Sequence, residues 1–234
     1  LMLNPLLASN VAIDGSRFLD WALNSFQLSA ITALLAVSIA LILIFNQRML
    51  KDWVSKLAST LIGLGYALPG AVVVVGLLIP IAWVQKNWPD TSIGYWMTAS
   101  IFGLIWAYLV RFCAVAIQSI QSGYARIPKS LDDSSRLLGI AGLQLLIRVH
   151  TPMLRRSILT AVLLVFVDVM KELPVTLVLR PFNSDTLAVM AYQLARDERL
   201  GEAALPSLAL VLAGLIPVIL LSRAMRHQRE SAHA

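Results

Sequence analysis

A short run of ionisable residues lies inside an otherwise apolar part of the sequence. Asp168, Lys171 and Glu172 are spaced i, i+3 and i+4, so an unbroken helix would place all three on one face. Charges at membrane depth are costly and usually face a bundle interior or a watery cavity. Lys171 can pair with Asp168 and lower that cost, and Pro174 should break the helix just beyond them.

These residue types suit a gate or a path for a polar solute. We hypothesise that Asp168, Lys171, Glu172 and Thr176 line or gate a translocation path. The alternative is an ion pair that merely pins helices together, and the sequence leaves both interpretations open. A metal site is not predicted, because hard cations want several oxygen ligands from one cavity and a lysine lies between these acids.

The composition is that of a membrane protein. Hydrophobic residues make up 58% of the 234 residues and charged residues 14%, with a mean hydropathy of +0.76. An average soluble domain carries about 25% charged residues, so lipid is the simplest solvent for the apolar excess. The single cysteine, Cys113, rules out an internal disulfide and a cysteine-based metal cluster. No cofactor is expected.

Five apolar stretches are long enough to cross a bilayer, for which a helix needs about 20 mostly apolar residues. They cover approximately residues 24–45, 57–84, 93–120, 158–179 and 206–221. The second stretch is rich in glycine and proline, so we expect it to be kinked or broken, and its glycines would let a neighbouring helix approach closely. The sequence therefore predicts one all-α integral membrane domain over residues 1–234, a polytopic bundle of about five transmembrane helices.

The basic residues predict the orientation of this bundle. Most of the 19 lie in three segments that alternate along the chain and so fall on one side: Arg48, Lys51 and Lys56; Arg126, Lys129, Arg136, Arg148, Arg155 and Arg156; Arg223, Arg226 and Arg229. The positive-inside rule makes that side cytoplasmic, which explains the net charge of +6 without nucleic-acid binding. We expect the N-terminus outside, the C-terminus and loop 121–157 in the cytoplasm, and loop 180–205 outside. Because no earlier span would carry that start outside, we expect this chain to be part of a longer one.

The cytoplasmic loop contains LDDSSRLLGIAGLQLLIRVHTP, residues 131–152. Apolar residues recur in it at helical spacing, and Gly139 and Gly142 interrupt the pattern. We expect two short helices with a turn between these glycines. The segment is too polar for lipid and too regular for a casual linker, so it can lie under the bundle and dock against a cytoplasmic partner.

This segment resembles a motif of the membrane subunits of ABC importers, which reads E-A-A, three residues, G, nine residues, I-x-L-P. The chain keeps every spacing with Asp133-Ser134-Ser135, Gly139 and Val149-His150-Thr151-Pro152. Only Gly139 and Pro152 match by identity. The resemblance implies a type I ABC importer permease fold in which this loop is the coupling helix, held in a cleft of an ATP-binding subunit. The alternative is a plain cytoplasmic helical hairpin.

The implied ATPase-coupling residues are Asp133, Ser134, Ser135, Gly139, Val149 and Pro152. Ser134, Ser135 and Gly139 would pack closely against the ATP-binding subunit, since bulky side chains would hold the two surfaces apart. The other implied partners are an extracytoplasmic (periplasmic) substrate-binding protein and a second transmembrane half, fused or separate. Loop 180–205 should form a short surface helix, and the binding protein is a candidate for contact with it.

A second stretch resembles the ferric-iron permeases, whose corresponding region commonly runs KELPATLLLRPF followed by an acid-Thr-Leu-Ala. The matching residues are Lys171-Glu172-Leu173-Pro174, Thr176, Arg180-Pro181-Phe182 and Asp185-Thr186-Leu187-Ala188. The likeness covers about residues 57–225 and is to the C-terminal half of a duplicated permease. It implies a multi-pass protein of the bacterial inner membrane that imports ferric iron. Sulfate, molybdate and polyamine are the alternative cargoes.

The source of energy separates this interpretation from its rivals. No phosphate loop of the G-x-x-x-x-G-K-[ST] type is present, so the chain is expected to be no enzyme itself and to move cargo by alternating access driven by a separate ATPase. The main rival is an ion-coupled secondary transporter with Asp168 and Glu172 as proton carriers, which leaves the coupling-loop spacing unexplained. An intramembrane enzyme is disfavoured, because the spans hold no paired histidines and no Ser/His dyad.

Overall fold

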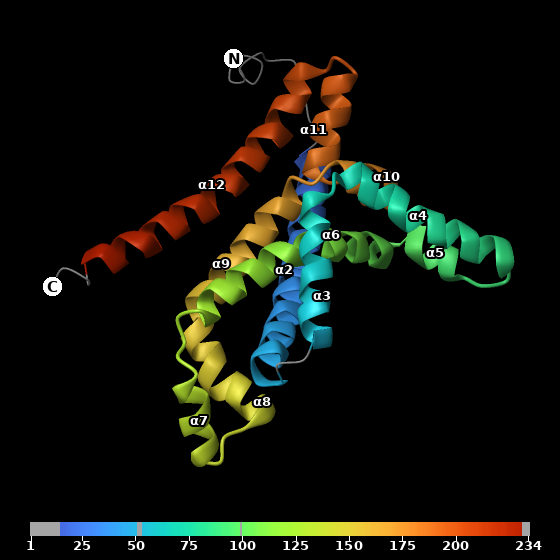
Figure 1. Ribbon diagram of the computed structural model, residues 1–234. Helices are drawn as coiled ribbons and strands as arrows, with labels where there is room; N and C mark the ends of the chain where they lie inside the picture. The colour runs from blue at the N-terminus through green and yellow to red at the C-terminus, as the bar shows by residue number, and fades with distance from the viewer. Residues whose placement is uncertain (1–14, 51–52, 99, 231–234) are drawn as a thin grey trace.

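The computed structural model describes residues 15–50, 53–98 and 100–230, and these ranges fold into helices joined by short turns (Figure 1). The elements are α2 (Gly15–Leu50), α3 (Trp53–Leu64), the 3₁₀ turn η1 (Gly65–Ala67), α4 (Gly70–Asn87), α5 (Ile93–Thr98), α6 (Ile101–Tyr124), α7 (Ser130–Leu137), α8 (Gly142–Leu145), the π-helical turn η2 (Leu146–His150), α9 (Thr151–Met170), α10 (Pro174–Leu179), α11 (Leu187–Arg196) and α12 (Leu200–Glu230). The all-α prediction is confirmed. The opening stretch 1–14 and Lys51 lie outside the described residues.

Helices α2, α6 and α9 form the core of the bundle. Alanines occupy their contact surfaces and are fully buried, among them Ala36, Ala40, Ala107 and Ala161. Small residues let helix backbones approach closely, which is how helices associate when the surrounding solvent is as apolar as their side chains. Large aliphatic and aromatic side chains on the outer surfaces, such as Leu34 and Phe102, remain exposed as a lipid-facing layer would require.

The second apolar stretch is broken, as its glycines and prolines predict. Helix α3 ends at Leu64, η1 follows, and Pro69 caps a separate helix, α4. A Cβ atom on Gly65 would lie 2.0 Å from the Val110 carbonyl oxygen, so only glycine fits where this turn crosses α6. Residues 57–84 are therefore not one crossing, and Figure 1 shows α4 and α5 projecting away from the core.

Two other stretches differ from their predicted limits. The stretch at 93–120 is divided into α5 and α6, and the Ser100 side chain caps α6 by accepting a hydrogen bond from the Gly103 amide at 3.3 Å. The stretch at 158–179 begins earlier, at Thr151, and is divided into α9 and α10. In the described part of the chain, length and apolar composition qualify three helices to cross a membrane, namely α2, α4 and α6.

The segment 180–205 contains the short helix that the sequence predicts, and this helix is half-buried, with Tyr192 and Arg196 exposed. Helix α11 packs against α12 and α2, and it buries Leu187, Val189 and Leu194. The Leu187 amide donates to the Ser25 hydroxyl of α2 at 2.8 Å, which anchors the start of α11. Helix α11 lies at the end of the molecule opposite α7 and α8 (Figure 1).

Candidate functional site

The loop between α6 and α9 folds as a hairpin of two short helices, α7 and α8, as predicted. Helix α7 ends in a Schellman motif, in which the Ile140 amide donates to the Ser135 carbonyl at 2.9 Å and the Gly139 amide to the Arg136 carbonyl at 3.0 Å. Gly139 has φ +78° and Gly142 has φ +56°. A Cβ atom at either glycine would meet nothing within 4 Å, so the backbone conformation, and not lack of space, requires glycine here.

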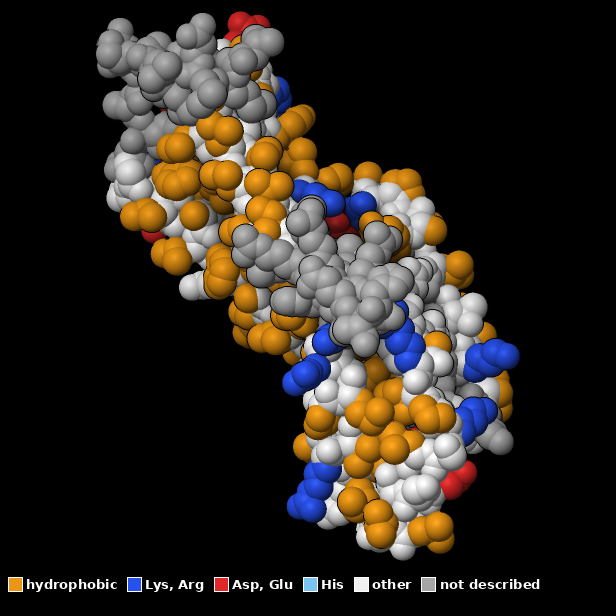
Figure 2. All heavy atoms as spheres, turned by 90° about the vertical axis from the view of Figure 1, so that its left-hand side faces the viewer, with side chains coloured by type: hydrophobic (Ala, Val, Ile, Leu, Met, Phe, Trp, Pro, Cys, Tyr) orange, Lys and Arg blue, Asp and Glu red, His pale blue; other side chains and the backbone are white. Residues whose placement is uncertain are grey.

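The outer surface of this hairpin is apolar. Leu137 is 90% exposed, and Leu138, Leu143 and Ile147 are also exposed. Figure 2 shows hydrophobic side chains among Lys and Arg side chains at the end of the molecule that α7 and α8 form. Exposed apolar side chains rimmed by polar ones are a feature of interaction sites.

The six predicted coupling residues are distributed around this hairpin. Asp133, Ser134 and Gly139 are exposed beside the apolar side chains. Ser135 instead faces the bundle and is buried, and Val149 packs against the cluster of Phe45, Leu145 and Leu146. Pro152 is exposed in the first turn of α9. The predicted close packing of Ser135 against a partner is therefore wrong for this conformation.

The predicted gate residues form two separate groups. Asp168 and Lys171 make the expected ion pair at 2.8 Å, and the Lys171 side chain is 64% exposed. Glu172 does not share a helix face with them, because α9 ends at Met170. Pro174 causes this break, since its ring would clash with the Met170 carbonyl and it has no N–H to donate.

Glu172 instead contacts α6 and α10. Its Oε2 accepts from Nη1 of Arg111 at 2.7 Å, and its Oε1 accepts from the Val175 amide at 3.1 Å. The Glu172 side chain is 5% exposed and the Arg111 side chain 21%. Both carboxylate oxygens are thus engaged, which disfavours Glu172 as a freely exchanging proton carrier.

Thr176 extends this group to a second residue of α6. The Thr176 hydroxyl donates to the Glu172 carbonyl at 2.7 Å, so the Tyr108 hydroxyl, 2.6 Å away, donates to Thr176. The side chains of Tyr108 and Thr176 are both buried. Tyr108 and Arg111 share one face of α6 at a spacing of three residues, which is the signal in the sequence that marks them as one polar site.

The start of α4 completes this group. A Cβ atom on Gly70 would lie 2.3 Å from Nη1 of Arg111 and 2.9 Å from Oε1 of Glu172, so the first residue of α4 touches the ion pair directly. The positive end of the α4 dipole therefore points at the Glu172 carboxylate. The two helix breaks, at residues 65–69 and 171–173, meet at this point. The described residues contain no group of three or more His, Cys, Asp or Glu side chains placed to hold a metal ion.

Apolar helices of membrane-spanning length, packed through buried alanines, are the architecture of a polytopic membrane protein. The chain belongs to the family of binding-protein-dependent transport system inner membrane components, whose profile matches residues 33–231. It has 27% identity over 214 residues with an Fe(3+)-transport system permease protein, FbpB 2, of Haemophilus influenzae. That match covers 90% of this chain and 40% of the relative, so the chain spans less than half of that protein's length.

Solved structures share the fold. The crystal structure of a bacterial alginate ABC transporter in complex with an alginate pentasaccharide-bound periplasmic protein matches with a TM-score of 0.65 and 15% identity, over 96% of this chain and 82% of that one. A structure of a bacterial ABC transporter involved in the import of the acidic polysaccharide alginate matches with a TM-score of 0.64 and 14% identity, over 97% and 88% of the two chains. The fold is thus that of a type I ABC importer permease.

Proposed function

We propose that the chain is the membrane-spanning permease part of an ATP-driven, binding-protein-dependent importer, and that separate ATP-binding subunits dock on the α7–α8 hairpin. The observation that carries this proposal is the exposed apolar surface of the hairpin, which coincides with the spacing of the coupling motif. A secondary transporter has no use for such a surface. The chain contains no phosphate loop of its own, so the ATPase is a partner.

Ferric iron is the proposed cargo. It is supported by the relative named as an Fe(3+)-transport permease and by the residues that carry the resemblance. Two of the residues shared with ferric-iron permeases, Glu172 and Thr176, belong to the polar cluster beside Arg111. Sulfate, molybdate and polyamine remain the alternative cargoes. The alginate structures support the fold alone at 14–15% identity.

The two ion pairs divide the proposed gating role. The exposed Lys171, paired with Asp168, is proposed to line the solute path. Glu172 and Arg111 hold the starts of α4 and α10 against α6, which makes them the closing contact between elements that must separate when the path opens. The alternative is that both pairs only hold helices together. In that case replacing them should reduce assembly of the complex but leave transport normal in the complexes that assemble.

The membrane is proposed to be the bacterial inner membrane, with the α7–α8 end in the cytoplasm and α11 outside. Basic residues around the hairpin support this orientation through the positive-inside rule. A binding protein would then deliver cargo at the α11 end, and a second transmembrane half, fused or separate, would complete the path.

Uptake of radiolabelled cargo tests the function. Cells lacking the gene, restored with the full-length version, would be compared for ferric iron, sulfate, molybdate and a polyamine, with and without Gly139→Arg. This change strains the φ +78° backbone. It also places a large side chain beside the proposed docking surface, which consists of the exposed side chains of Leu137, Leu138, Leu143 and Ile147. Its matched control is Gly15→Arg, at an open and exposed position at the start of α2, away from the hairpin.

Each outcome has a distinct meaning. Ferric uptake that is blocked by Gly139→Arg alone supports both cargo and docking. Uptake of another solute, blocked in the same way, keeps the importer and discards iron. Uptake indifferent to Gly139→Arg in a well-expressed protein points to a gradient-driven transporter.

A further inference from the structure

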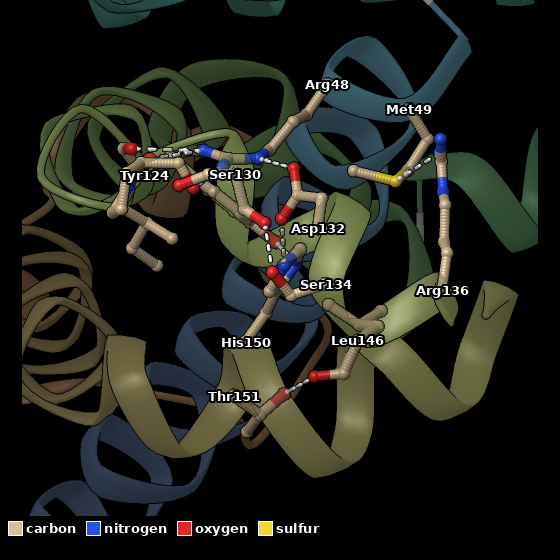
Figure 3. Close-up of polar contacts among 12 residues, drawn as sticks. Arg48, Met49, Tyr124, Ser130, Asp132, Ser134, Arg136, Leu146, His150 and Thr151 are labelled. Atoms are coloured by element: carbon tan, nitrogen blue, oxygen red, sulfur yellow. Dashed lines mark hydrogen bonds and ion pairs between the residues drawn. The ribbon is translucent and has the colours of Figure 1, made fainter. Parts of the chain in front are cut away.

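A second buried polar cluster, separate from the one around Glu172 and Arg111, lies on the inner side of α7, opposite the docking surface. It consists of Arg48, Tyr124, Asp132 and His150, which we call the α7 joint (Figure 3). Asp132 is 7% exposed, Arg48 10% and His150 not at all. The four side chains come from the end of α2, the end of α6, the first turn of α7 and the last residue of η2. The joint therefore ties the hairpin to the three helices of the core.

Arg48 is the hub of the joint. Its Nε donates to Oδ2 of Asp132 at 2.6 Å. Its Nη1 donates to the carbonyls of Tyr124 at 3.2 Å and Ile127 at 3.0 Å, and its Nη2 to the carbonyl of Pro128 at 3.0 Å. Carbonyls at the end of a helix lack intrahelical partners and attract cations, so α6 ends where a guanidinium can satisfy them. The planar fork of arginine fixes α2, α6 and α7 in one relative geometry.

His150 supports Asp132 from the other side. Its Nε2 lies 3.0 Å from Oδ1 of Asp132, and its Nδ1 lies 3.1 Å from the Tyr124 hydroxyl. A carboxylate only accepts, so Nε2 carries the proton and Nδ1 accepts from the Tyr124 hydroxyl. The ring also packs edge-on against Phe45 at 5.5 Å. Every polar atom of the imidazole thus has a partner, and both oxygens of Asp132 are taken by different elements.

Charge in the joint is balanced although it is buried. Burial alone would raise the pKa of Asp132, but the hydrogen bonds from Arg48 and His150 outweigh it and hold that pKa below its ordinary value. Burial lowers the pKa of His150, so the ring is neutral at neutral pH. A buried ion pair adds little net stability compared with apolar residues, whereas it demands one geometry. The joint is therefore better suited to fixing the position of α7 than to stabilising the fold.

The two adjacent acids of α7 have opposite surroundings. Asp133 is exposed beside the docking surface, and Asp132 points into the bundle. Helix α6 then connects the joint to the polar cluster, because Tyr124 and Arg111 are about 13 residues apart, or roughly 20 Å along the helix axis. Helix α9 begins directly after His150 and ends before Glu172.

We propose that the α7 joint transmits displacement of α7 to α2, α6 and α9, and that Asp132 is its positioning residue. This inference rests on the proposed function, since it takes a docked ATPase as the source of the displacement. Asp132 has no place in the docking surface itself. Its loss should therefore separate ATP hydrolysis from transport and leave docking intact.

Asp132→Asn is the variant of choice, because it keeps the size and one acceptor and removes the charge. The complete importer, with its ATPase and binding protein, would be reconstituted in liposomes with ferric-iron-loaded binding protein as the probe. We expect the ATPase to co-purify and to hydrolyse ATP within about twofold of the wild-type rate, while uptake per ATP falls at least tenfold. Asp20→Asn is the matched control, since Asp20 is an exposed acid on α2.

A second measurement needs no cargo. Spin labels at Ser130→Cys on α7 and Ile42→Cys on α2, both exposed positions, report the geometry of the joint once Cys113 is replaced by serine. The distance distribution should stay narrow in wild-type protein with and without ATP, and broaden in Asp132→Asn. If Asp132→Asn does not assemble, Tyr124→Phe removes only the hydroxyl and should lower uptake per ATP about threefold.

The outcomes separate the two proposals. A wild-type complex that captures no ATPase overturns the proposed function. A docked ATPase combined with an unchanged ratio of uptake to hydrolysis in Asp132→Asn, or with an unchanged distance distribution, overturns the joint alone. A parallel fall of hydrolysis and uptake also overturns it, because that result marks a docking residue.

Discussion

The ion pair between Glu172 and Arg111 allows a quantitative prediction. Glu172→Gln removes the negative charge from a side chain that is 5% exposed and leaves the Arg111 guanidinium without its carboxylate. The Nε atom of Arg111 is already buried without a hydrogen-bond partner, so no other group takes over. Removing one member of a buried pair costs about 3–5 kcal/mol. Because glutamine can still accept from the Val175 amide, we expect about 3 kcal/mol.

A double-mutant cycle isolates this pair. Arg111→Met should cost a similar amount, because it leaves the Glu172 carboxylate with only backbone donors. The double variant Glu172→Gln/Arg111→Met should cost no more than about the larger single change, which gives a coupling of about 3 kcal/mol. For a domain of this size, 3 kcal/mol lowers the unfolding midpoint by about 6–12 °C.

The single cysteine provides the assay. Cys113 lies on α6 and is buried in the core of the bundle, so it reacts with a fluorogenic maleimide only when the bundle opens. Thermal unfolding of the purified complex would be followed in this way, with Cys113 as its only cysteine. Lys171→Met is the control, because the Lys171 side chain is 64% exposed and its ion pair with Asp168 should be worth less than about 1 kcal/mol. If the free-energy costs of Glu172→Gln and Arg111→Met simply add in the double variant, the pairing of Glu172 with Arg111 is refuted. Normal ferric uptake by a well-assembled Glu172→Gln complex would refute the gating role.

Three further predictions follow from other contacts. Leu137→Glu should leave the unfolding midpoint unchanged within about 1 °C, because Leu137 is exposed. It should weaken capture of the ATPase at least tenfold, because burying a leucine at an interface contributes about 1.5–3 kcal/mol. Equal ATPase capture by the wild-type and variant proteins argues against docking here. Gly65→Ala should cost about 2 kcal/mol or more through its clash with the Val110 carbonyl, and Gly63→Ala, in open space, should be neutral; equal midpoints for the two would contradict the clash. His150→Gln should reduce the loss of stability as the pH falls. The folded-state pKa of His150 is depressed below 6.5, so the unfolded chain binds the proton first and stability declines below about pH 6.5; an unaltered pH profile of the midpoint rejects this.

The breaks near Gly65, Gly139 and Pro174 could be predicted from the sequence because their causes are local, whereas the division of 93–120 into α5 and α6 was not predicted. Pro174 lacks an N–H, Gly65 and Pro69 interrupt an apolar stretch, and Gly139 ends a short amphipathic helix. Each property belongs to a single residue and holds in any tertiary context. For the same reason the hairpin, with its two short helices, is recovered correctly.

The polar partners of Glu172 and Asp132 could not be predicted, because they belong to helices distant in sequence. The expectation that Glu172 shares a face with Asp168 assumed an unbroken helix up to Glu172, whereas Pro174 already ends it at Met170. Arg111, the true partner, lies 61 positions away. Asp132 and Asp133 carry the same side chain at adjacent positions, and only the packing of α7 against α2 makes one buried and the other exposed.

Under the proposed mechanism, the arrangement of stiff and broken elements determines where motion is expressed. Buried alanines pack α2, α6 and α9 so closely that bending within this core would lose many contacts. Helix α6 is continuous from Ile101 to Tyr124, whereas the chain beside Arg111 is broken at both residues 65–69 and 171–173. A displacement at the α7 end would therefore travel through the core as a rigid body and be absorbed at the breaks. The contact between Glu172 and Arg111 lies at that point, so it is where a movement of the hairpin should first open the path.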